Sequence, residues 1–205
     1  MNLETVLHAI AVVTVLSVLS ISIYFRHQAA RSGEKISVHE EGFLILNLRR
    51  IFGLALWMSV FTYLINPSWM AWSSLPLPFW ARGLGAGLML VCVPLLYWMF
   101  YSLGRNITPT VVTRQQHSLV THGPYRWIRH PLYTFAFLFF AGLSLLAASW
   151  FMVLVLILGS PVLLLRTPIE EQRLIERFGD QYREYMQHTG RYLPRWKGLF
   201  GVNRS

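Results

Sequence analysis

The sequence predicts an all-α integral membrane protein with about five transmembrane helices and a further helical segment at its C-terminal end. Of its 205 residues, 54% are hydrophobic and 13% are charged, whereas soluble domains carry about 25% charged residues. Five apolar runs divide the chain, and its polar residues gather in two stretches, 102–130 and 166–205. The length suits a single domain, so residues 1–205 are expected to fold as one unit.

Each apolar run is interpreted as one helix. Runs of about 20 residues can cross a bilayer, and the first three runs reach that length. The first is too long for the core of a signal peptide, so we expect it to be retained as a span. The last two are shorter and nearly adjacent, which predicts a tight helical hairpin, and Pro161 is expected to kink its second helix. The five runs are 3–25, 43–65, 79–101, 132–147 and 150–165.

The basic residues are distributed unevenly between the two predicted sides of the membrane. The segments assigned to one side contain 17 lysines and arginines, whereas the opposite side has only Arg82, near the start of the third run. Since basic residues favour the cytoplasmic side, we expect a cytoplasmic C-terminus and an outer N-terminus. Trp69, Trp72 and Trp80 then fit an aromatic belt at the outer interface. A prokaryotic inner membrane is the expected location.

Composition also argues against several classes of function. The net charge of +9 is attributed to contacts with anionic lipid headgroups rather than with nucleic acid. Cys92 is the only cysteine, which excludes an intrachain disulfide and a Cys-x-x-Cys metal site, and no metal is expected. Gly83, Gly85 and Gly87 open an apolar run with no strand before them. They therefore indicate close helix packing rather than a nucleotide-binding loop.

Within the single domain, residues 1–101 hold three spans, 102–196 form the core around the hairpin, and 197–205 form a tail. Both polar stretches lie on the predicted cytoplasmic side, where water-soluble molecules arrive. Chemistry is therefore expected where these two stretches meet.

The first polar stretch contains a run of aromatic and basic residues from His117 to Tyr133. His130 precedes Pro131 and is therefore biased towards an extended conformation. Pro131 suits the first position of the fourth helix, because its missing N–H would have no partner there. The resulting helix N-terminus is a natural place for a carboxylate or a phosphate. The alternative is an interfacial loop in which Arg126 and Arg129 bind lipid phosphates.

The second polar stretch begins with Arg166 and Glu170, which are four residues apart and hence on one helical face. Arg166 at the membrane edge can hold an anionic headgroup or a carboxylate, and Glu170 can receive an amine. The alternative is a capping box, in which Thr167 is the N-cap and Glu170 bonds back to it. A short helix over 171–178 is expected next, ended by Gly179 and followed by a helix that Asp180 caps.

Together these motifs resemble the isoprenylcysteine carboxyl methyltransferases and the related phospholipid methyltransferases. The family pattern is Gly-x-Tyr-x-x-x-Arg-His-Pro-x-Tyr, a helical hairpin, Arg-x-x-x-Glu-Glu-x-x-Leu and Phe-Gly-x-x-Tyr-x-x-Tyr, closed by an Arg or Gly-x-Pro element. The resemblance covers about half of the chain. The matching residues are Gly123, Tyr125, Arg129, His130, Pro131, Tyr133, Arg166, Glu170, Glu171, Leu174, Phe178, Gly179, Tyr182, Tyr185, Arg191 and Pro194.

The resemblance implies a membrane methyltransferase that uses S-adenosylmethionine, with 102–196 as its cofactor-binding and catalytic core. It implies catalytic roles for Arg166 and Glu170, and substrate-side roles for Arg166 and Arg129. The implied cofactor-binding residues are His117, Ser118, Leu119, Val120, Tyr125, His130, Pro131, Leu132, Tyr133, Glu170 and Glu171.

The expected acceptor is a lipophilic molecule, in first place the carboxylate of a prenylated cysteine. A phospholipid or a small molecule methylated on nitrogen or sulfur is the alternative acceptor. An NADPH-dependent reductase similar to the sterol reductases, or a non-enzymatic membrane partner protein, is less favoured. Membrane lipids are expected partners and nucleic acid is not. The oligomeric state is unknown from the sequence.

Overall fold

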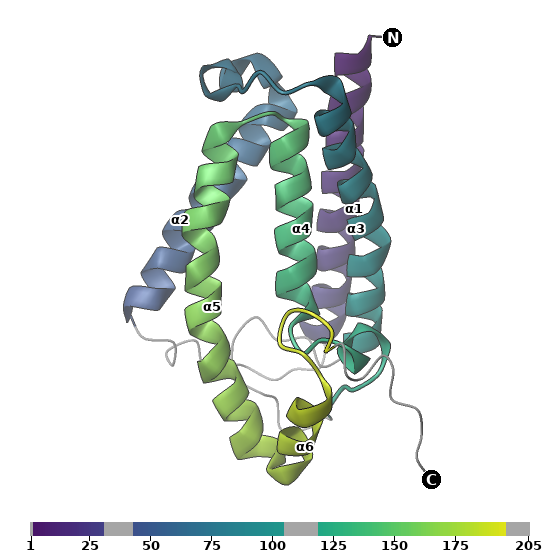
Figure 1. Ribbon diagram of the computed structural model, residues 1–205, viewed down its shortest axis with the longest axis vertical. Coiled ribbons are helices and arrows are strands. Elements are labelled where there is room, and N and C mark those ends of the chain that lie inside the picture. The colour runs from purple at the N-terminus through teal and green to yellow at the C-terminus, as the bar shows by residue number, and fades with distance from the viewer. Residues whose placement is uncertain (1, 31–42, 105–118, 196–205) are drawn as a thin grey trace.

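The computed structural model describes residues 2–30, 43–104 and 119–195, and every regular element in them is a helix (Figure 1). Two isolated β-bridges, Ser74 with Ser149 and Ile128 with Gly190, are the only strand-like pairings within those ranges. The α-helices are α1 (Leu3–Ala30), α2 (Phe43–Ile65), α3 (Phe79–Leu103), α4 (Pro131–Leu146), α5 (Trp150–Phe178) and α6 (Asp180–His188). Two short 3-10 helices are η1 (Pro67–Ser73) and η3 (Gly123–Arg126).

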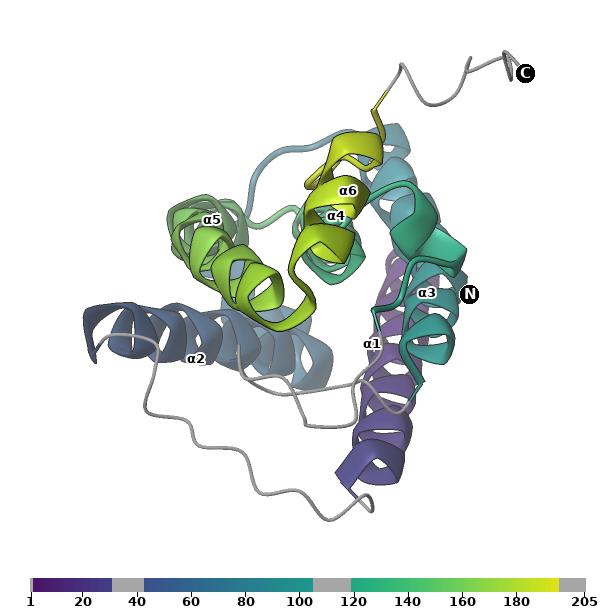
Figure 2. The same cartoon turned by 90° about the horizontal axis from the view of Figure 1, so that it is seen from below.

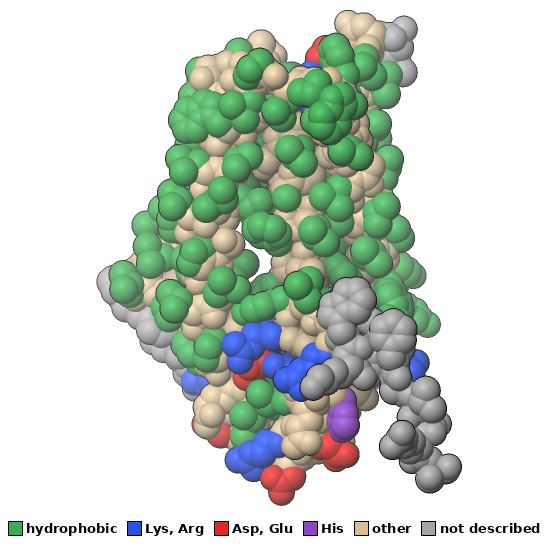
Figure 3. Space-filling view, in the orientation of Figure 1, with side chains coloured by type: hydrophobic (Ala, Val, Ile, Leu, Met, Phe, Trp, Pro, Cys, Tyr) green, Lys and Arg blue, Asp and Glu red, His purple; other side chains and the backbone are tan. Residues whose placement is uncertain are grey.

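The five long helices form a bundle in which α3 packs on α1 and α4, and α5 packs on α2 and α4. Seen end-on in Figure 2, α4 lies between α3 and α5. The N-terminus lies at one end of the bundle, and α6 lies at the other (Figure 1). Figure 3 shows hydrophobic side chains along the helices and charged side chains gathered around the α6 end.

Four helices, α1, α2, α3 and α5, are long and apolar enough to cross a membrane, and α4 is a shorter apolar helix. Their outward-facing side chains are largely apolar, as at Leu54, Met58 and Leu84. A soluble protein rarely exposes such extensive apolar surface. The predicted fold class, an all-α membrane protein with five apolar helices and a C-terminal helical segment, is confirmed.

The helices α3 and α4 approach each other at two glycines. A Cβ added to Gly85 would lie 2.5 Å from the Gly142 carbonyl oxygen and 2.7 Å from the Leu146 nitrogen, both main-chain atoms. A Cβ at Gly83 or Gly87 would meet nothing within 4 Å. The helix-packing interpretation is therefore confirmed for Gly85, and its two neighbours in the pattern serve no such contact.

The predicted hairpin is present, and its turn spans only Ala147 to Ser149. Ser149 caps the N-terminus of α5, with its Oγ accepting from the Met152 N–H. Its Oγ also lies 2.8 Å from that of Ser73 in η1. The hairpin turn is thereby tied to the loop between α2 and α3.

The C-terminal part of α5 differs from the expectation. One continuous helix runs from Trp150 to Phe178 and contains both Pro161 and Pro168. No new helix starts at Thr167, so the capping-box interpretation and the separate helix over 171–178 are wrong. The Thr167 hydroxyl instead donates to the Leu163 carbonyl one turn earlier.

The continuous α5 has a consequence for the position of Glu170. Since the helix does not restart, it carries Arg166, Glu170 and Glu171 beyond the apolar part towards α6. Gly179, with a φ of 55°, ends α5 as predicted and also serves as the N-cap of α6. Asp180 is the first residue of α6 and does not cap it, and its carboxylate pairs with Arg183.

Candidate active site

The N-terminus of α4 forms one wall of the candidate site. Pro131 is its first residue, as predicted, and His130 is its N-cap, whose own side chain makes no capping hydrogen bond. His130 is buried, and its ring stacks on that of Tyr133 with the planes 6° apart and the centroids 5.6 Å apart. The first turn of α4 therefore presents an imidazole and a phenol side by side.

Glu170 is the first of two acidic centres that face this wall. Its carboxylate accepts from the Tyr133 hydroxyl at 2.8 and 2.9 Å and from an Arg166 Nη at 3.1 Å. His130 Nδ1 lies 3.6 Å from it. These contacts join α4 to α5 and fix the direction of the carboxylate.

Glu171 is the second acidic centre, and its side chain is more deeply buried, with 4% of it exposed against 17% for Glu170. Its Oε1 accepts from Arg129 Nε at 2.9 Å, and its Oε2 accepts from an Arg191 Nη. His130 Nε2 lies 3.4 Å from Oε1. The imidazole of His130 therefore sits between two carboxylates.

The segment that follows α6 is docked onto the beginning of α4. The N–H groups of Arg129 and His130 donate to the carbonyls of Gly190 and Arg191, at 2.8 and 3.0 Å. The Arg129 guanidinium also donates to the Met186 and Thr189 carbonyls at the end of α6. Arg129 thus joins α6, α5 and the start of α4. Its substrate-side role stays a prediction.

Tyr192 is a site residue that sequence reasoning missed. Its ring centroid lies 6.0 Å from that of His130, and its hydroxyl donates to the Thr167 Oγ1 at 2.6 Å. Thr134 in α4 donates to the Tyr192 carbonyl. No periodic pattern marks an irregular segment of this kind, so only the Arg191 to Pro194 motif beside it pointed to the region.

Three more of the predicted cofactor-binding residues, Leu119, Val120 and Tyr125, lie in η3 or just before it. Tyr125 and Leu132 both pack against the apolar cluster that includes Phe135. The Tyr125 carbonyl accepts a hydrogen bond from the Tyr185 hydroxyl at 2.6 Å. Leu119 lines a cleft of about 280 Å³ between its own segment and α6, and the adjacent Val120 is half-buried. His117 and Ser118 lie outside the described residues.

The aromatic residues of α6 contribute to the interior rather than to an exposed face. Tyr182 is buried, and within the described ranges its hydroxyl has no hydrogen-bond partner. Burial raises the pKa of Tyr182, and likewise the pKa of Tyr185. Both phenols are therefore neutral at physiological pH.

The structure brings six of the predicted residues into one polar cluster: Arg129, His130, Tyr133, Arg166, Glu170 and Glu171. Arg191 joins it, so three arginines face two glutamates and the cluster has a net positive charge. In the described parts of the chain, no group of three or more His, Cys, Asp or Glu side chains is placed to hold a metal ion. The cluster is suited to binding a ligand that carries both an amine and a carboxylate.

Comparison with known proteins identifies the family of this chain. The sequence profile of the phospholipid methyltransferase family matches residues 80–181. The protein-S-isoprenylcysteine O-methyltransferase of Tribolium castaneum is 37% identical over 79 residues, which are 38% of this chain and 28% of that protein. The protein-S-isoprenylcysteine O-methyltransferase A of Arabidopsis thaliana is 27% identical over 156 residues, 73% of this chain and 76% of that protein.

A solved structure shows the same fold. It is that of a eukaryotic intramembrane Ras methyltransferase, isoprenylcysteine carboxyl methyltransferase, with a TM-score of 0.51 and 23% identity. The match covers 80% of this chain and 55% of the solved chain, so this protein spans only part of the length of that structure and of the beetle relative. The matched profile includes α3, the α4–α5 hairpin and the glutamates of the polar cluster. The chain belongs to the phospholipid methyltransferase family of integral membrane methyltransferases.

Proposed function

We propose that this protein is an S-adenosylmethionine-dependent methyltransferase that methylates the carboxylate of a lipophilic acceptor, as in isoprenylcysteine carboxyl methylation. Membership of the family and the names of the two relatives support the reaction class. The positions of Arg166 and Glu170 support the choice of acceptor. We also propose that the site faces the cytoplasm, in line with the distribution of basic residues.

The observation that carries the proposal is the position of Arg166. It is buried in the polar cluster, yet it directly follows Leu164 and Leu165, whose side chains are exposed on the apolar surface of α5. A cation at this point meets the polar end of a molecule whose tail lies in the bilayer. Arginine suits such a partner, because its planar guanidinium matches the geometry of a carboxylate.

Glu170 is the residue expected to receive the amino group of the cofactor. The neighbouring Glu171 holds Arg129 and Arg191 with its two oxygens and is more deeply buried. The uncapped N-terminus of α4 beside it suits a carboxylate. These groups fit the amino-acid end of S-adenosylmethionine. When bound, S-adenosylmethionine supplies a methyl group on a positively charged sulfur.

The protein's part in the reaction is mainly positioning. A carboxylate acceptor is ionised at neutral pH, so no residue has to remove a proton from it. Arg166 would orient the acceptor, and Tyr133 and Glu170 would hold the amino-acid end of the cofactor. Correct placement of two reactants alone supplies about 7–11 kcal/mol towards the barrier. An amine acceptor would need a base, and His130 is the group placed for that role.

The test is methyl transfer by the purified full chain from methyl-labelled S-adenosylmethionine. Three acceptors are compared: an S-prenylated N-acetylcysteine, the same compound with its carboxylate converted to an amide, and phosphatidylethanolamine. A methyl ester releases labelled methanol in alkali, whereas an N-methyl or S-methyl product does not. We expect alkali-labile label with the first compound only.

Alkali-stable label with phosphatidylethanolamine would replace the carboxylate acceptor by an amine. Failure of all three acceptors, with S-adenosylhomocysteine still bound, would reject a lipophilic acceptor of these classes. Failure to bind S-adenosylhomocysteine in a folded sample would reject the cofactor itself.

A further inference from the structure

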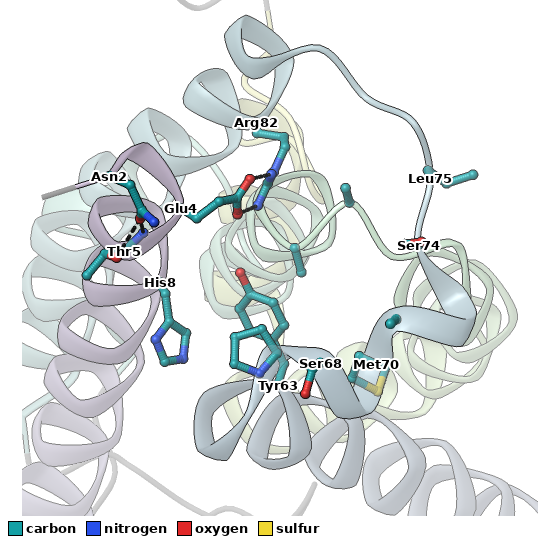
Figure 4. Close-up of a pocket in the computed structure, with 14 residues that line it drawn as sticks. Asn2, Glu4, Thr5, His8, Tyr63, Ser68, Met70, Ser74, Leu75 and Arg82 are labelled. Carbon is teal, nitrogen blue, oxygen red and sulfur yellow. Dashed lines mark hydrogen bonds and ion pairs between the residues drawn. The ribbon is translucent and has the colours of Figure 1, made fainter.

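A second polar cavity lies at the opposite end of the bundle from the candidate active site. It has a volume of about 480 Å³ and is lined by residues of α1, the end of α2, η1, α3 and the α4–α5 turn (Figure 4). Ala147 at its wall is the C-cap of α4, whereas His130 at the candidate active site is its N-cap. The 16 residues of α4 place the two sites about 24 Å apart.

A fixed ion pair forms one side of this cavity. Arg82 of α3 donates to both oxygens of Glu4 in α1, at 2.5 and 2.8 Å, and through its Nε to the Leu146 carbonyl at 2.9 Å. The Arg82 side chain is 13% exposed, whereas that of Glu4 is 56% exposed. These bonds use three of the five N–H groups of the guanidinium. The carboxylate is therefore held in place while remaining accessible from the cavity.

His8 and Tyr63 extend the polar surface from the ion pair. His8 Nε2 lies 3.1 Å from the Leu64 carbonyl and must donate to it, so the neutral ring presents Nδ1 as an acceptor. In the described chain this Nδ1 has no hydrogen-bond partner. The Tyr63 ring packs edge-on against His8 at 5.7 Å. Figure 4 shows its hydroxyl pointing towards Glu4 and Arg82.

Exposed aromatic side chains locate this cavity with respect to the bilayer. Trp69 and Trp72 of η1 and Trp80 of α3 are each more than half exposed at the same end of the molecule. Such tryptophans lie at the level of the lipid headgroups. Arg82 is within one helical turn of Trp80. The cavity therefore opens into the headgroup layer of the leaflet opposite the candidate active site. Lipid headgroups are the most abundant molecules in that layer.

We propose that this cavity binds the headgroup of a zwitterionic aminophospholipid. Glu4 and His8 Nδ1 offer two acceptors for its ammonium, and the Tyr63 and His8 rings add aromatic faces that favour a cation. Arg82 also bonds the Tyr63 hydroxyl, whose own proton is the donor offered to the phosphate. The volume is within the usual range of small-ligand sites. An anionic phosphoglycerol headgroup lacks the ammonium and would meet the Glu4 carboxylate, so it is disfavoured.

A purely structural clasp is the competing explanation, since the Glu4 and Arg82 pair also links α1, α3 and α4. Native mass spectrometry of the detergent-purified full chain distinguishes the two. The protein is given equal amounts of phosphatidylethanolamine and phosphatidylglycerol with identical acyl chains. We expect at least fivefold more phosphatidylethanolamine adducts. Glu4→Gln should bring the two lipids to nearly equal adducts, because the ammonium loses a charge-assisted hydrogen bond.

Three further variants complete the test. His8→Phe keeps the ring but removes both nitrogens, and it should also lower the preference; it replaces Glu4→Gln if that variant does not fold. Glu176→Gln, on the exposed surface of α5, should leave the preference unchanged. Glu170→Gln should do the same, which separates this cavity from a lipid acceptor bound at the candidate active site.

Equal adducts of the two lipids with the unmodified chain would overturn the proposal. So would a preference that survives both Glu4→Gln and His8→Phe, and so would a preference that only Glu170→Gln removes. None of these measurements involves methyl transfer, so the outcome is independent of the proposed enzymatic activity.

Discussion

The two adjacent glutamates of α5 should respond very differently to the same substitution, and Glu171→Gln is the sharper case. The Glu171 carboxylate is the buried counter-ion of Arg129, whose side chain is also buried, and it holds Arg191 with its other oxygen. Through these contacts it connects α5 to the start of α4 and to the segment after α6. Removing its charge therefore affects three parts of the fold at once.

The size of the effect follows from the burial of the pair. Breaking a buried ion pair by removing one partner costs about 3–5 kcal/mol, because the other charge stays buried. Glutamine can still accept one hydrogen bond from Arg129, so about 3 kcal/mol is expected. For a chain of this size 1 kcal/mol corresponds to about 2–4 °C in Tm. The apparent Tm of Glu171→Gln should therefore fall by about 6–12 °C.

The assay is thermal unfolding in detergent at a fixed scan rate, because membrane proteins unfold irreversibly on heating and the apparent Tm depends on that rate. Glu176→Gln is the matched control, since Glu176 bonds only an exposed Gln172 side chain in the described structure. Its apparent Tm should change by less than about 2 °C, as for most surface substitutions. Equal shifts for the two variants would refute the claim that Glu171 organises the site.

Three more predictions concern the site and the helix packing. Glu170→Gln should weaken binding of S-adenosylhomocysteine about tenfold in calorimetry, because one charge-assisted hydrogen bond is lost. Arg166→Lys keeps the charge but loses the planar fork, so kcat/KM for a prenylated carboxylate should fall at least about tenfold with cofactor affinity unchanged. Gly85→Ala places a Cβ against the Gly142 main chain and should cost about 1–3 kcal/mol of stability, whereas Gly83→Ala should be neutral or stabilising.

Each of these has a contrary result. Unchanged affinity in Glu170→Gln would mean that another group receives the cofactor's amine. Equal losses of turnover and cofactor affinity in Arg166→Lys would show that Arg166 is not dedicated to the acceptor. Matching apparent Tm values for Gly85→Ala and Gly83→Ala would contradict the close approach of α3 and α4.

Local sequence was sufficient for the parts of the fold that depend on local physics. An apolar run in a membrane protein must be helical, because only a helix satisfies its own backbone hydrogen bonds in lipid. This is why the five helices and the tight hairpin could be predicted without coordinates. The start of α4 at Pro131 was equally accessible, since proline without an N–H fits that position best.

Local sequence misled at Thr167. The Thr-Pro-x-Glu pattern is typical of a helix start, yet α5 continues through Pro168 without interruption. The Thr167 hydroxyl instead donates to the Leu163 carbonyl and accepts from the Tyr192 hydroxyl, which lies 25 residues further along the chain. Whether a helix starts at a threonine depends on which partner forms the best hydrogen bond with its hydroxyl. A partner that is distant in sequence cannot be recognised from the local pattern.

Some features of the candidate site follow from the order of residues along the chain, and others depend on how distant segments pack together. Residue types and their spacing singled out His130, Arg166 and Glu170 and the family to which the chain belongs, because these depend on order along the chain. The pairing of Arg129 and Arg191 with Glu171, and the docking of Tyr192, depend on how α4, α5 and the segment after α6 converge. Charges in three separate segments find their partners only when packing has brought those segments together.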